Sequence, residues 1–164
     1  SKDSKLAYSI NEYNYLTFKL ILQNYPLKSI KEIYNPWNKY CFEVKGKVYT
    51  LGEIEHKILR KMGEPRIHFA INCASESCPK LLNQAYEEKQ LEKQLIRATN
   101  LFLLDTTKNI ITDKYLKLSR IFLWFGNDFG SKKERLEFIS KYSGFKIEFT
   151  KIKYLKYDWS LNEQ

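Results

Sequence analysis

Residues 66–79 carry more structural information than any other part of this chain, and they read Arg66-Ile67-His68-Phe69-Ala70-Ile71-Asn72-Cys73-Ala74-Ser75-Glu76-Ser77-Cys78-Pro79. The two isoleucines and the phenylalanine alternate with His68, Ala70 and Asn72, which is the period of a half-buried β-strand. This strand would end at Cys73, and a loop of small polar residues, closed by a second cysteine and a proline, would follow it. A rigid element that gives way to a loop often presents a side chain to a cleft, so we expect a functional site here.

The length and composition of the chain are those of one folded domain. With 164 residues, of which 43% are hydrophobic and 15% aromatic, it can bury a core without disulfides or metals. Its longest apolar runs, 102–104 and 121–125, are far shorter than a bilayer span, so no transmembrane segment is expected in this chain. Residues 1–5 are polar and do not resemble a signal peptide, and a start at Ser1 without methionine indicates that the original targeting is hidden.

The net charge of +9 raises the question of nucleic acid as a partner. The basic residues are spread through nearly every segment, and the nearest cluster, Lys57, Arg60 and Lys61, has Glu55 and Glu64 beside it. Asn, Ile, Lys and Tyr are all abundant, as AT-rich coding would produce, and this explains the charge without a partner. Nucleic acid is therefore not expected as a ligand.

The pattern along the chain predicts an α+β fold, in which a single domain over residues 1–164 packs helices around a small, mostly antiparallel sheet. Apolar residues at helical spacing, capping boxes at 50–53 and 131–134, and glycine or proline stops define the helices. Alternating residues around short turns define the strands, one of which is 66–72. We expect helices at residues 4–24, 50–62, 87–104, 119–125 and 131–142, and further strands at 40–44, 47–49, 109–112, 115–118 and 145–157, with turns at Lys45-Gly46 and Asp113-Lys114.

Polar residues at three helical positions need an explanation. Asn14 lies among apolar residues of the first helix, and a buried asparagine must be hydrogen-bonded, so it could orient another side chain. A structural network or a partly exposed helix edge would also account for it. Glu55 and His56 lie in the middle of the second helix, where a lone histidine is more often a surface or satisfied residue than a catalyst.

The cysteines allow several interpretations. Cys73 and Cys78 could form a disulfide that closes a small loop, or they could bind zinc together with His56 and His68. Cys73 could instead be a nucleophile, which needs a histidine to take its proton and a third group to orient that histidine. Both thiols could also be simply buried, as Cys41 in its hairpin strand is expected to be. The spacing is not that of a zinc knuckle, so we expect no structural metal and no cofactor.

Six segments of the chain, taken together, resemble one known family. They are Asn11–Leu22, Tyr25–Ile30, Pro36-Trp37, Leu51–Leu59, Pro65–Pro79 and Tyr157–Asn162. In this order and at these separations they resemble the family called domain of unknown function 547, and the resemblance covers nearly the whole chain. The family carries Trp-Ile-Asn-Leu-Tyr-Asn in its first helix, and residues 8–14 keep both asparagines and the tyrosine but lack the tryptophan. Further helical sequence precedes this motif in the family, so this chain is expected to lack an N-terminal helical part.

The resemblance implies a set of polar positions that could form one site. They are Asn11, Asn14, Glu55, His56, His68, Asn72, Cys73, Cys78, Asp158 and Asn162. These residue types suit a papain-like or transglutaminase-like thiol hydrolase or acyl transferase that acts on amide or peptide-like substrates. In the preferred assignment Cys73 is the nucleophile and His56 the base, with Glu55, Asn14 or Asp158 orienting it, and His68 is the alternative base. In such enzymes the cysteine usually opens a long helix, whereas Cys73 is expected to follow a strand.

A second hypothesis belongs to a different class. The same residues could hold together a non-catalytic, envelope-associated domain that binds a peptide-like or protein partner. Many bacterial members of the family resemble exported proteins, so an exported or periplasmic location and a Cys73–Cys78 disulfide are expected, whereas plant members often lack the second cysteine. The first hypothesis requires a reactive Cys73 thiol, and the second an inert or oxidised one. In either case we expect Asn14, Glu55, His56 and Cys73 to cluster, because polar groups on apolar segments need one another as hydrogen-bond partners.

Overall fold

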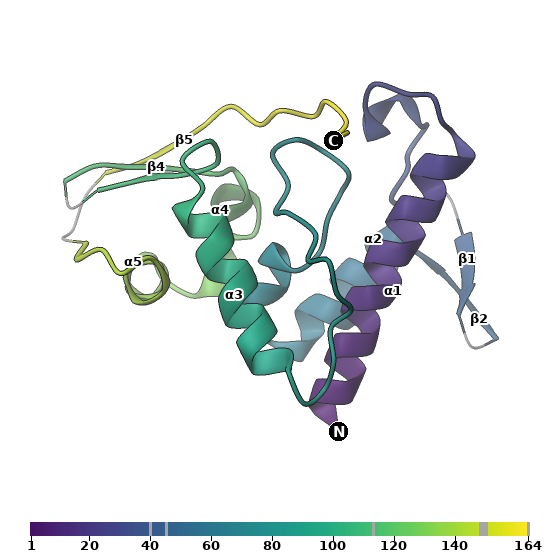
Figure 1. Ribbon diagram of the computed structural model, residues 1–164, viewed down its shortest axis with the longest axis horizontal. Coiled ribbons are helices and arrows are strands. Elements are labelled where there is room, and N and C mark those ends of the chain that lie inside the picture. Colours follow the sequence, from purple (N-terminus) through teal and green to yellow (C-terminus); the bar gives the residue numbers. More distant parts are fainter. Residues whose placement is uncertain (40, 45, 113, 148–150, 164) are drawn as a thin grey trace.

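The computed structural model in Figure 1 describes residues 1–39, 41–44, 46–112, 114–147 and 151–163. Its longest element is the helix α1 (Lys2–Gln23), which begins where the Ser1 hydroxyl accepts a hydrogen bond from the backbone N–H of Ser4. The buried face of α1 repeats at helical spacing through Leu6, Ile10, Tyr13, Thr17 and Leu20, as the sequence predicts. Among the described residues, no helix combines the length and the apolar character that crossing a membrane requires.

The second predicted helix is confirmed, but its hydrogen-bonding pattern changes along its length. It starts as α2 (Leu51–Glu53), where Thr50 and Glu53 form the predicted capping box, with both hydrogen bonds at 3.1 Å. It continues as a π-helix, η2 (Ile54–Leu59), and a 3-10 turn, η3 (Arg60–Met62). π-helical segments occur frequently at functional sites, and Glu55 and His56 both lie on this one.

The strand predicted at 66–72 is wrong, because this segment begins with the 3-10 helix η4 (Pro65–Phe69). The Glu64 side chain caps η4 by accepting a hydrogen bond from the backbone N–H of Arg66, and Pro65 occupies the first helical position, where its missing N–H costs nothing. The alternation that suggested a strand has no exposed side, since every residue from 66 to 72 is buried. A segment buried all round needs no two-sided strand, and the strand period carries no information there.

The remaining helices follow the predicted positions closely. They are α3 (Leu91–Leu104), α4 (Ile121–Trp124) and α5 (Lys132–Ser143), with short 3-10 turns η1 (Ile30–Glu32) and η5 (Gly126–Phe129). The capping box at Ser131 and Glu134 is confirmed, and α5 ends at Gly144 with a φ of 76°, the left-handed conformation that favours glycine. Helix α3 begins later than predicted, because residues 88–90 form a turn.

The described strands form two small sheets instead of the single sheet that was expected. Strands β1 (Cys41–Val44) and β2 (Lys47–Thr50) form an antiparallel hairpin. Strands β3 (Ile110–Ile111) and β4 (Leu116–Leu118) form a second one, and β5 (Ile152–Tyr154) joins β4 in parallel. Both hairpins and the α+β fold class are thus confirmed, whereas the sheet containing 66–72 is not present. The parts of these predictions at residues 40, 45, 113 and 148–150 lie outside the described residues.

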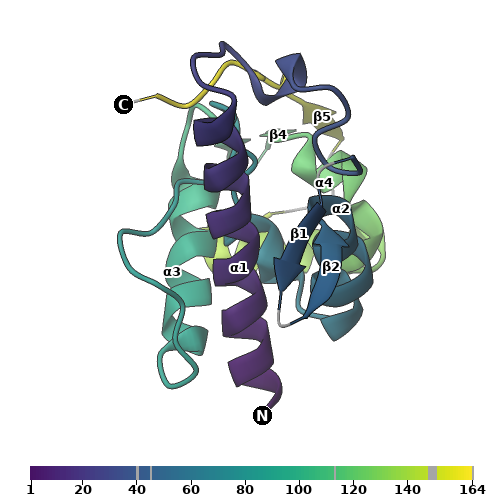
Figure 2. The same cartoon turned by 90° about the vertical axis from the view of Figure 1, so that its right-hand side faces the viewer.

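The hydrophobic core consists of two clusters, and the segment after Pro65 contributes to both. Ile67, Ala70 and Ile71 belong to the cluster around α1, whereas Phe69 belongs to the cluster around α3, α4 and α5. Figure 1 shows these two groups of elements on either side of the η4 segment. In Figure 2, which is turned by 90°, α1 faces the viewer. The 65–72 segment therefore lies between the two clusters of the core, where it carries His68 and leads directly into Cys73.

The C-terminal segment returns across the loop at residues 73–78, which we call the cysteine loop. The backbone N–H of Glu76 donates to the carbonyl of Ser160 at 2.8 Å, and that of Asn162 donates to the carbonyl of Ala74 at 3.2 Å. Ser75 and Leu161 form an isolated antiparallel bridge. These contacts bring Tyr157, which is 84 residues away from Cys73 in the sequence, to the cysteine pair.

Candidate functional site

A cavity of about 330 Å³ opens where η2, η4, the cysteine loop, α4 and the C-terminal segment meet. We call it the cysteine cavity. It is lined by Tyr13, Trp37, Asn38, Glu55, His56, His68, Ile71, Cys73, Cys78, Pro79, Ile121, Trp124, Phe125, Tyr157 and Trp159. Its volume lies at the lower end of the range of about 300–1,000 Å³ for ligand pockets. A larger depression of about 650 Å³ along α3 contains none of the predicted site residues.

Aromatic side chains form much of the wall of the cysteine cavity. The ring centroids of Trp124 and Tyr157 lie 4.8 Å apart, and those of Tyr157 and Trp159 lie 4.6 Å apart. Trp37 extends this group, with its centroid 5.9 Å from that of Trp159. These residues come from three distant parts of the chain, and their rings offer flat apolar surfaces to an occupant.

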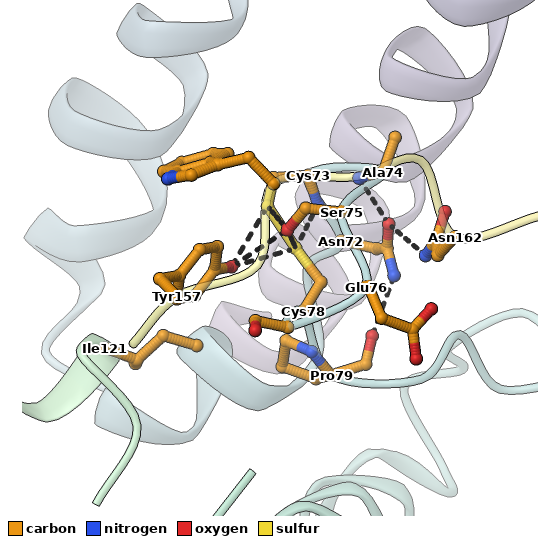
Figure 3. The surroundings of a disulfide bond; sticks show 12 residues. Asn72, Cys73, Ala74, Ser75, Glu76, Cys78, Pro79, Ile121, Tyr157 and Asn162 are labelled. Atoms are coloured by element: carbon orange, nitrogen blue, oxygen red, sulfur yellow. Dashed lines mark hydrogen bonds between the residues drawn. A yellow bond between two sulfur atoms is a disulfide. The ribbon is translucent and has the colours of Figure 1, made fainter. Parts of the chain in front are cut away.

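Cys73 and Cys78 are joined by a disulfide in this structure (Figure 3). Cys78 is buried, with 3% of its surface exposed, whereas Cys73 is half-buried. The hydroxyl oxygens of Ser75 and Tyr157 lie 3.2 and 3.4 Å from the Cys73 sulfur, and Figure 3 shows both pointing toward the sulfur atoms. The cysteine pair is therefore oxidised here. Within the described ranges, no three side chains of His, Cys, Asp or Glu are grouped as metal ligands would be.

Glu55 forms a buried acidic pair with a tyrosine of α1. The Tyr13 hydroxyl donates a hydrogen bond to Oε2 of Glu55 at 3.2 Å. Burial raises the pKa of Glu55 above its ordinary value, and burial together with the Glu55 charge raises the pKa of Tyr13 well above its own. Glu55 therefore keeps its proton to a higher pH than an exposed glutamate does.

His68 is held by an aspartate that the sequence analysis did not identify. Nε2 of His68 lies 2.8 Å from Oδ2 of Asp128, and the Arg60 guanidinium binds both oxygens of Asp128, at 2.6 and 2.7 Å. The hydrogen bonds from Arg60 hold the pKa of Asp128 below its ordinary value. Burial lowers the pKa of His68 to about 4, although Asp128 acts in the opposite direction. The ring of His68 stacks on Phe125 with centroids 4.2 Å apart, which fixes its plane.

The hydrogen-bond partners of the two histidines distinguish their chemistry. Because Asp128 is ionised, Nε2 of His68 carries the proton, and its Nδ1 keeps a lone pair that can accept one. In His56 the Nδ1 lies 3.1 Å from Nη1 of Arg60, and since a guanidinium only donates, this nitrogen is already used as an acceptor. His56 is also exposed. Nδ1 of His68 can therefore still accept a proton, whereas Nδ1 of His56, the base preferred from the sequence, already accepts a hydrogen bond from Arg60.

The other predicted site residues fall into two groups. Glu55, His56, His68 and Cys73 line the same cavity although they come from η2, η4 and the cysteine loop. Asn14 is not among the lining residues: its Nδ2 donates to the carbonyl of Ala70 at 2.9 Å, and its Oδ1 accepts from the backbone N–H of Asn72 at 2.8 Å. These bonds replace the strand partner that the 65–72 segment lacks.

Asp158, the other residue suggested to orient the base, also lies outside the lining. It is exposed, and its carboxylate accepts hydrogen bonds from the backbone and hydroxyl of Ser160 at 2.9 and 2.6 Å. The carboxylate that contacts His68 is that of Asp128. In the sequence it stands in the turn Gly126-Asn127-Asp128, and no local pattern connects it with a histidine 60 residues away.

The burial of His68 predicts a specific pH dependence of stability. A histidine whose pKa is lowered on folding stabilises the protein above its unfolded pKa of about 6.5, and this contribution is lost as the pH falls toward the folded pKa. With a folded pKa of about 4, His68 should account for a loss of up to about 3 kcal/mol in the free energy of unfolding between pH 6.5 and 4. The measurement is urea denaturation across this range for the wild type and His68→Gln, whose neutral amide can still donate to Asp128.

The difference between the two proteins is the informative quantity, because burial of Glu55 acts on stability in the opposite sense. His68→Gln should flatten the acid loss of stability. The matched control His56→Gln changes the exposed histidine, and this variant should lose stability at acid pH as the wild type does. Equal slopes for the wild type and His68→Gln would mean that His68 is protonated readily in the folded protein.

Comparison with known families matches part of this chain. The family model described as "Protein of unknown function, DUF547" matches residues 1–103. This range contains Glu55, His56, His68 and Cys73, whereas Asp128 and Tyr157 lie beyond it. Comparison with curated proteins and with solved structures gives no significant match.

Proposed function

Because the chain belongs to the family of proteins of unknown function DUF547, whose description names no activity, we propose its function from the cysteine cavity itself. The proposal is a thiol-dependent hydrolase or acyl transferase that acts on amide or peptide-like substrates. Cys73 is the nucleophile in the reduced protein, His68 is its base, and Asp128 positions His68. The observation that carries this proposal is the contact at 2.8 Å between Asp128 and His68, which lines the same cavity as Cys73.

Each group has a role that its surroundings support. Nδ1 of His68 takes the proton of the Cys73 thiol, and the thiolate sulfur attacks the acyl carbon. The imidazolium that results is stabilised by the Asp128 carboxylate and returns the proton to the leaving group. Water or an acceptor nucleophile then releases the acyl group from Cys73. Burial favours the protonated form of Glu55, and in that form its carboxyl can donate a hydrogen bond to the substrate.

The aromatic wall indicates what part of a substrate enters. Trp37, Trp124 and Trp159 surround the cavity together with Tyr157 and offer flat apolar faces. An apolar or aromatic side chain next to the scissile amide would cover them and exclude water from the thiolate. The Lys31 ammonium, 4.1 Å from the ring centroid of Trp159, adds a positive charge at this edge.

The disulfide has a direct consequence for this activity. A sulfur bonded to Cys78 is no nucleophile, so acyl transfer should depend on a reductant. We expect the reduced protein to be acylated at Cys73 by p-nitrophenyl acetate in a burst of one acyl group per chain. The oxidised protein should show no burst. Intact-mass measurement and peptide mapping locate the acyl group.

Three substitutions make this experiment decisive. Cys73→Ser should abolish the burst, and Cys78→Ser should give it without reductant, because Cys73 then has no partner. Cys41→Ser, which changes the third cysteine, serves as the control and should behave as the wild type. If the reduced protein exposes its thiols to titration but Cys73 is not acylated, the proposal is wrong.

A non-catalytic binding domain is the second candidate, and one observation favours it. The oxidised Cys73 sulfur is unavailable for attack, and the polar groups around it are already satisfied by one another, as the Arg60–Asp128–His68 chain shows. In this case the oxidised protein should bind peptides with aromatic side chains, detectable as quenching of tryptophan fluorescence. Trp124→Ala should weaken this binding, whereas reduction should leave it unchanged.

A further inference from the structure

We propose that the Cys73–Cys78 disulfide is itself a reactive group, which exchanges with small thiols and disulfides that enter the cysteine cavity. Cys73 receives the incoming sulfur, and Cys78 leaves as a thiolate. This is an oxidation–reduction activity that goes beyond acyl transfer and does not require it. Burial, hydrogen bonding and the rigidity of the loop each support it.

The two sulfurs differ in access. Cys73 is half-buried, whereas Cys78 has 3% of its surface exposed. A thiolate attacks a disulfide along the axis of the sulfur–sulfur bond, so the sulfur that faces solvent is the one that reacts. Attack from the cavity therefore falls on Cys73 and expels Cys78. A volume of about 330 Å³ admits a small thiol or a single cysteine side chain, and not a folded partner.

The surroundings of Cys78 suit a departing thiolate. The backbone N–H of Cys73 points at the Cys78 sulfur with an N–S distance of 2.9 Å. The hydroxyl of Ser75 lies 3.3 Å from this sulfur and that of Tyr157 lies 3.4 Å from it, and each can turn its proton toward developing negative charge. Burial raises the pKa of Tyr157 to about 12, so this hydroxyl keeps its proton. Hydrogen-bond donors lower the pKa of a thiol and make it a better leaving group.

The loop is held in place independently of the disulfide. Asn72 spans it, accepting from the backbone N–H of Ala74 at 2.6 Å and donating to the carbonyl of Pro79 at 2.7 Å. Lys108 donates to the carbonyl of Glu76 at 2.6 Å. The C-terminal segment also binds this loop through backbone hydrogen bonds, and Figure 3 shows Asn162 beside Asn72 and Ala74. The two sulfurs should therefore stay close after reduction. A mixed disulfide on Cys73 is then resolved quickly by Cys78, and the pair can close again.

The reaction is balanced as follows. A thiolate RS⁻ forms a bond to the Cys73 sulfur, the bond between Cys73 and Cys78 breaks, and its electron pair goes to Cys78. A second RS⁻ attacks the sulfur of R in the mixed disulfide, which releases RSSR and the Cys73 thiolate. Two thiols are oxidised and the protein gains two electrons. The reverse sequence, with a small disulfide as oxidant, reoxidises the protein.

The test uses glutathione disulfide and the full chain in a Cys41→Ser background. Cys78→Ser leaves Cys73 as the single thiol, and Cys73→Ser leaves Cys78. We expect glutathionylation of Cys73 to be at least about tenfold faster than that of Cys78, because the half-buried Cys73 sulfur is accessible to glutathione disulfide and the buried Cys78 sulfur is not. Time-resolved intact mass gives both rates, and circular dichroism checks that both variants are folded. Equal rates, or faster reaction at Cys78, would overturn the proposed direction of attack.

The leaving-group argument has its own test. Reduction of the oxidised wild type by glutathione should proceed without denaturant, and Tyr157→Phe should slow it severalfold. Tyr115→Phe, which removes the hydroxyl of a tyrosine that does not line the cysteine cavity, should leave the rate unchanged. A disulfide that resists reduction until the chain is unfolded would exclude this activity. No acyl substrate is used in this test, so its results do not depend on whether Cys73 is acylated. Conversely, if the disulfide resists reduction, acylation of Cys73 can still be measured in Cys78→Ser.

Discussion

Phe69→Ala is expected to lower the free energy of unfolding by about 3–5 kcal/mol, which is the range for removing a large aromatic side chain from a packed core. Phe69 is completely buried, and its ring centroid lies 4.9 Å from that of Phe102 and 5.6 Å from that of Phe122. Phe129 and Phe138 lie at 5.8 and 6.1 Å. Four rings from α3, α4, η5 and α5 therefore meet on this one side chain, and alanine would leave a cavity that none of them can fill.

Urea denaturation with an unchanged m value is the measurement for this prediction. The matched control is Phe18→Ala, since 56% of Phe18 is exposed on α1, and its effect should stay within about 0.5 kcal/mol. A loss of less than about 1 kcal/mol in Phe69→Ala would contradict the description of Phe69 as the centre of the aromatic cluster around α3, α4 and α5. Because Phe69 follows His68 directly, this variant should also weaken acylation of Cys73 in the proteins that remain folded.

Asp128→Asn is expected to slow acylation of Cys73 in the reduced protein by about 10²–10⁴-fold, the usual contribution of an efficient general base. Asparagine keeps the size of the side chain, but it removes the negative charge that orients His68 and stabilises its imidazolium form. It also leaves the Arg60 guanidinium without its bidentate partner. The measurement is the rate of the acyl burst as a function of pH.

The pH profile separates a positioning role from a structural one. Without the carboxylate, His68 should take the proton of Cys73 less effectively, so the apparent pKa at which Cys73 becomes reactive should rise toward that of an isolated thiol. A variant that is merely unstable would keep the wild-type profile at reduced amplitude. Asp105→Asn is the control, because Asp105 accepts hydrogen bonds from Thr107 outside the cysteine cavity. A wild-type rate in folded Asp128→Asn would remove Asp128 and His68 from the proposed mechanism.

Local interactions made much of the fold predictable from the sequence. The capping boxes at Thr50 and Ser131 connect residues three positions apart, and both helices begin where those boxes indicate. The apolar period of α1 and the two hairpins likewise depend on near neighbours, and they are found at the predicted places. Hydrogen bonds within one turn are specified by a few adjacent residues, so a single sequence contains them.

The 65–72 segment shows where local reasoning fails. Its alternating residues favour a strand only if one side faces solvent, and both sides are buried between the two clusters of the core. Its backbone is satisfied by the side chain of Asn14 on α1, a partner 56 residues away from Ala70. Whether a segment is enclosed on all sides depends on the packing of distant elements, and for that reason the period of 66–72 misled the assignment.

The candidate site divides in the same way. The types and order of Glu55, His56, His68 and Cys73 were sufficient to select them from the sequence, and these residues do line one cavity. The choice of His68 over His56, and of Asp128 as its partner, required the tertiary structure, because it depends on contacts across 60 or more residues. Tyr157 reaches the cysteines only because the C-terminal segment folds back over their loop. The sequence thus determined which reactive side chains this protein has. Which of them contact one another depends on the tertiary structure, because burial and long-range hydrogen bonds bring together residues that are far apart in the chain.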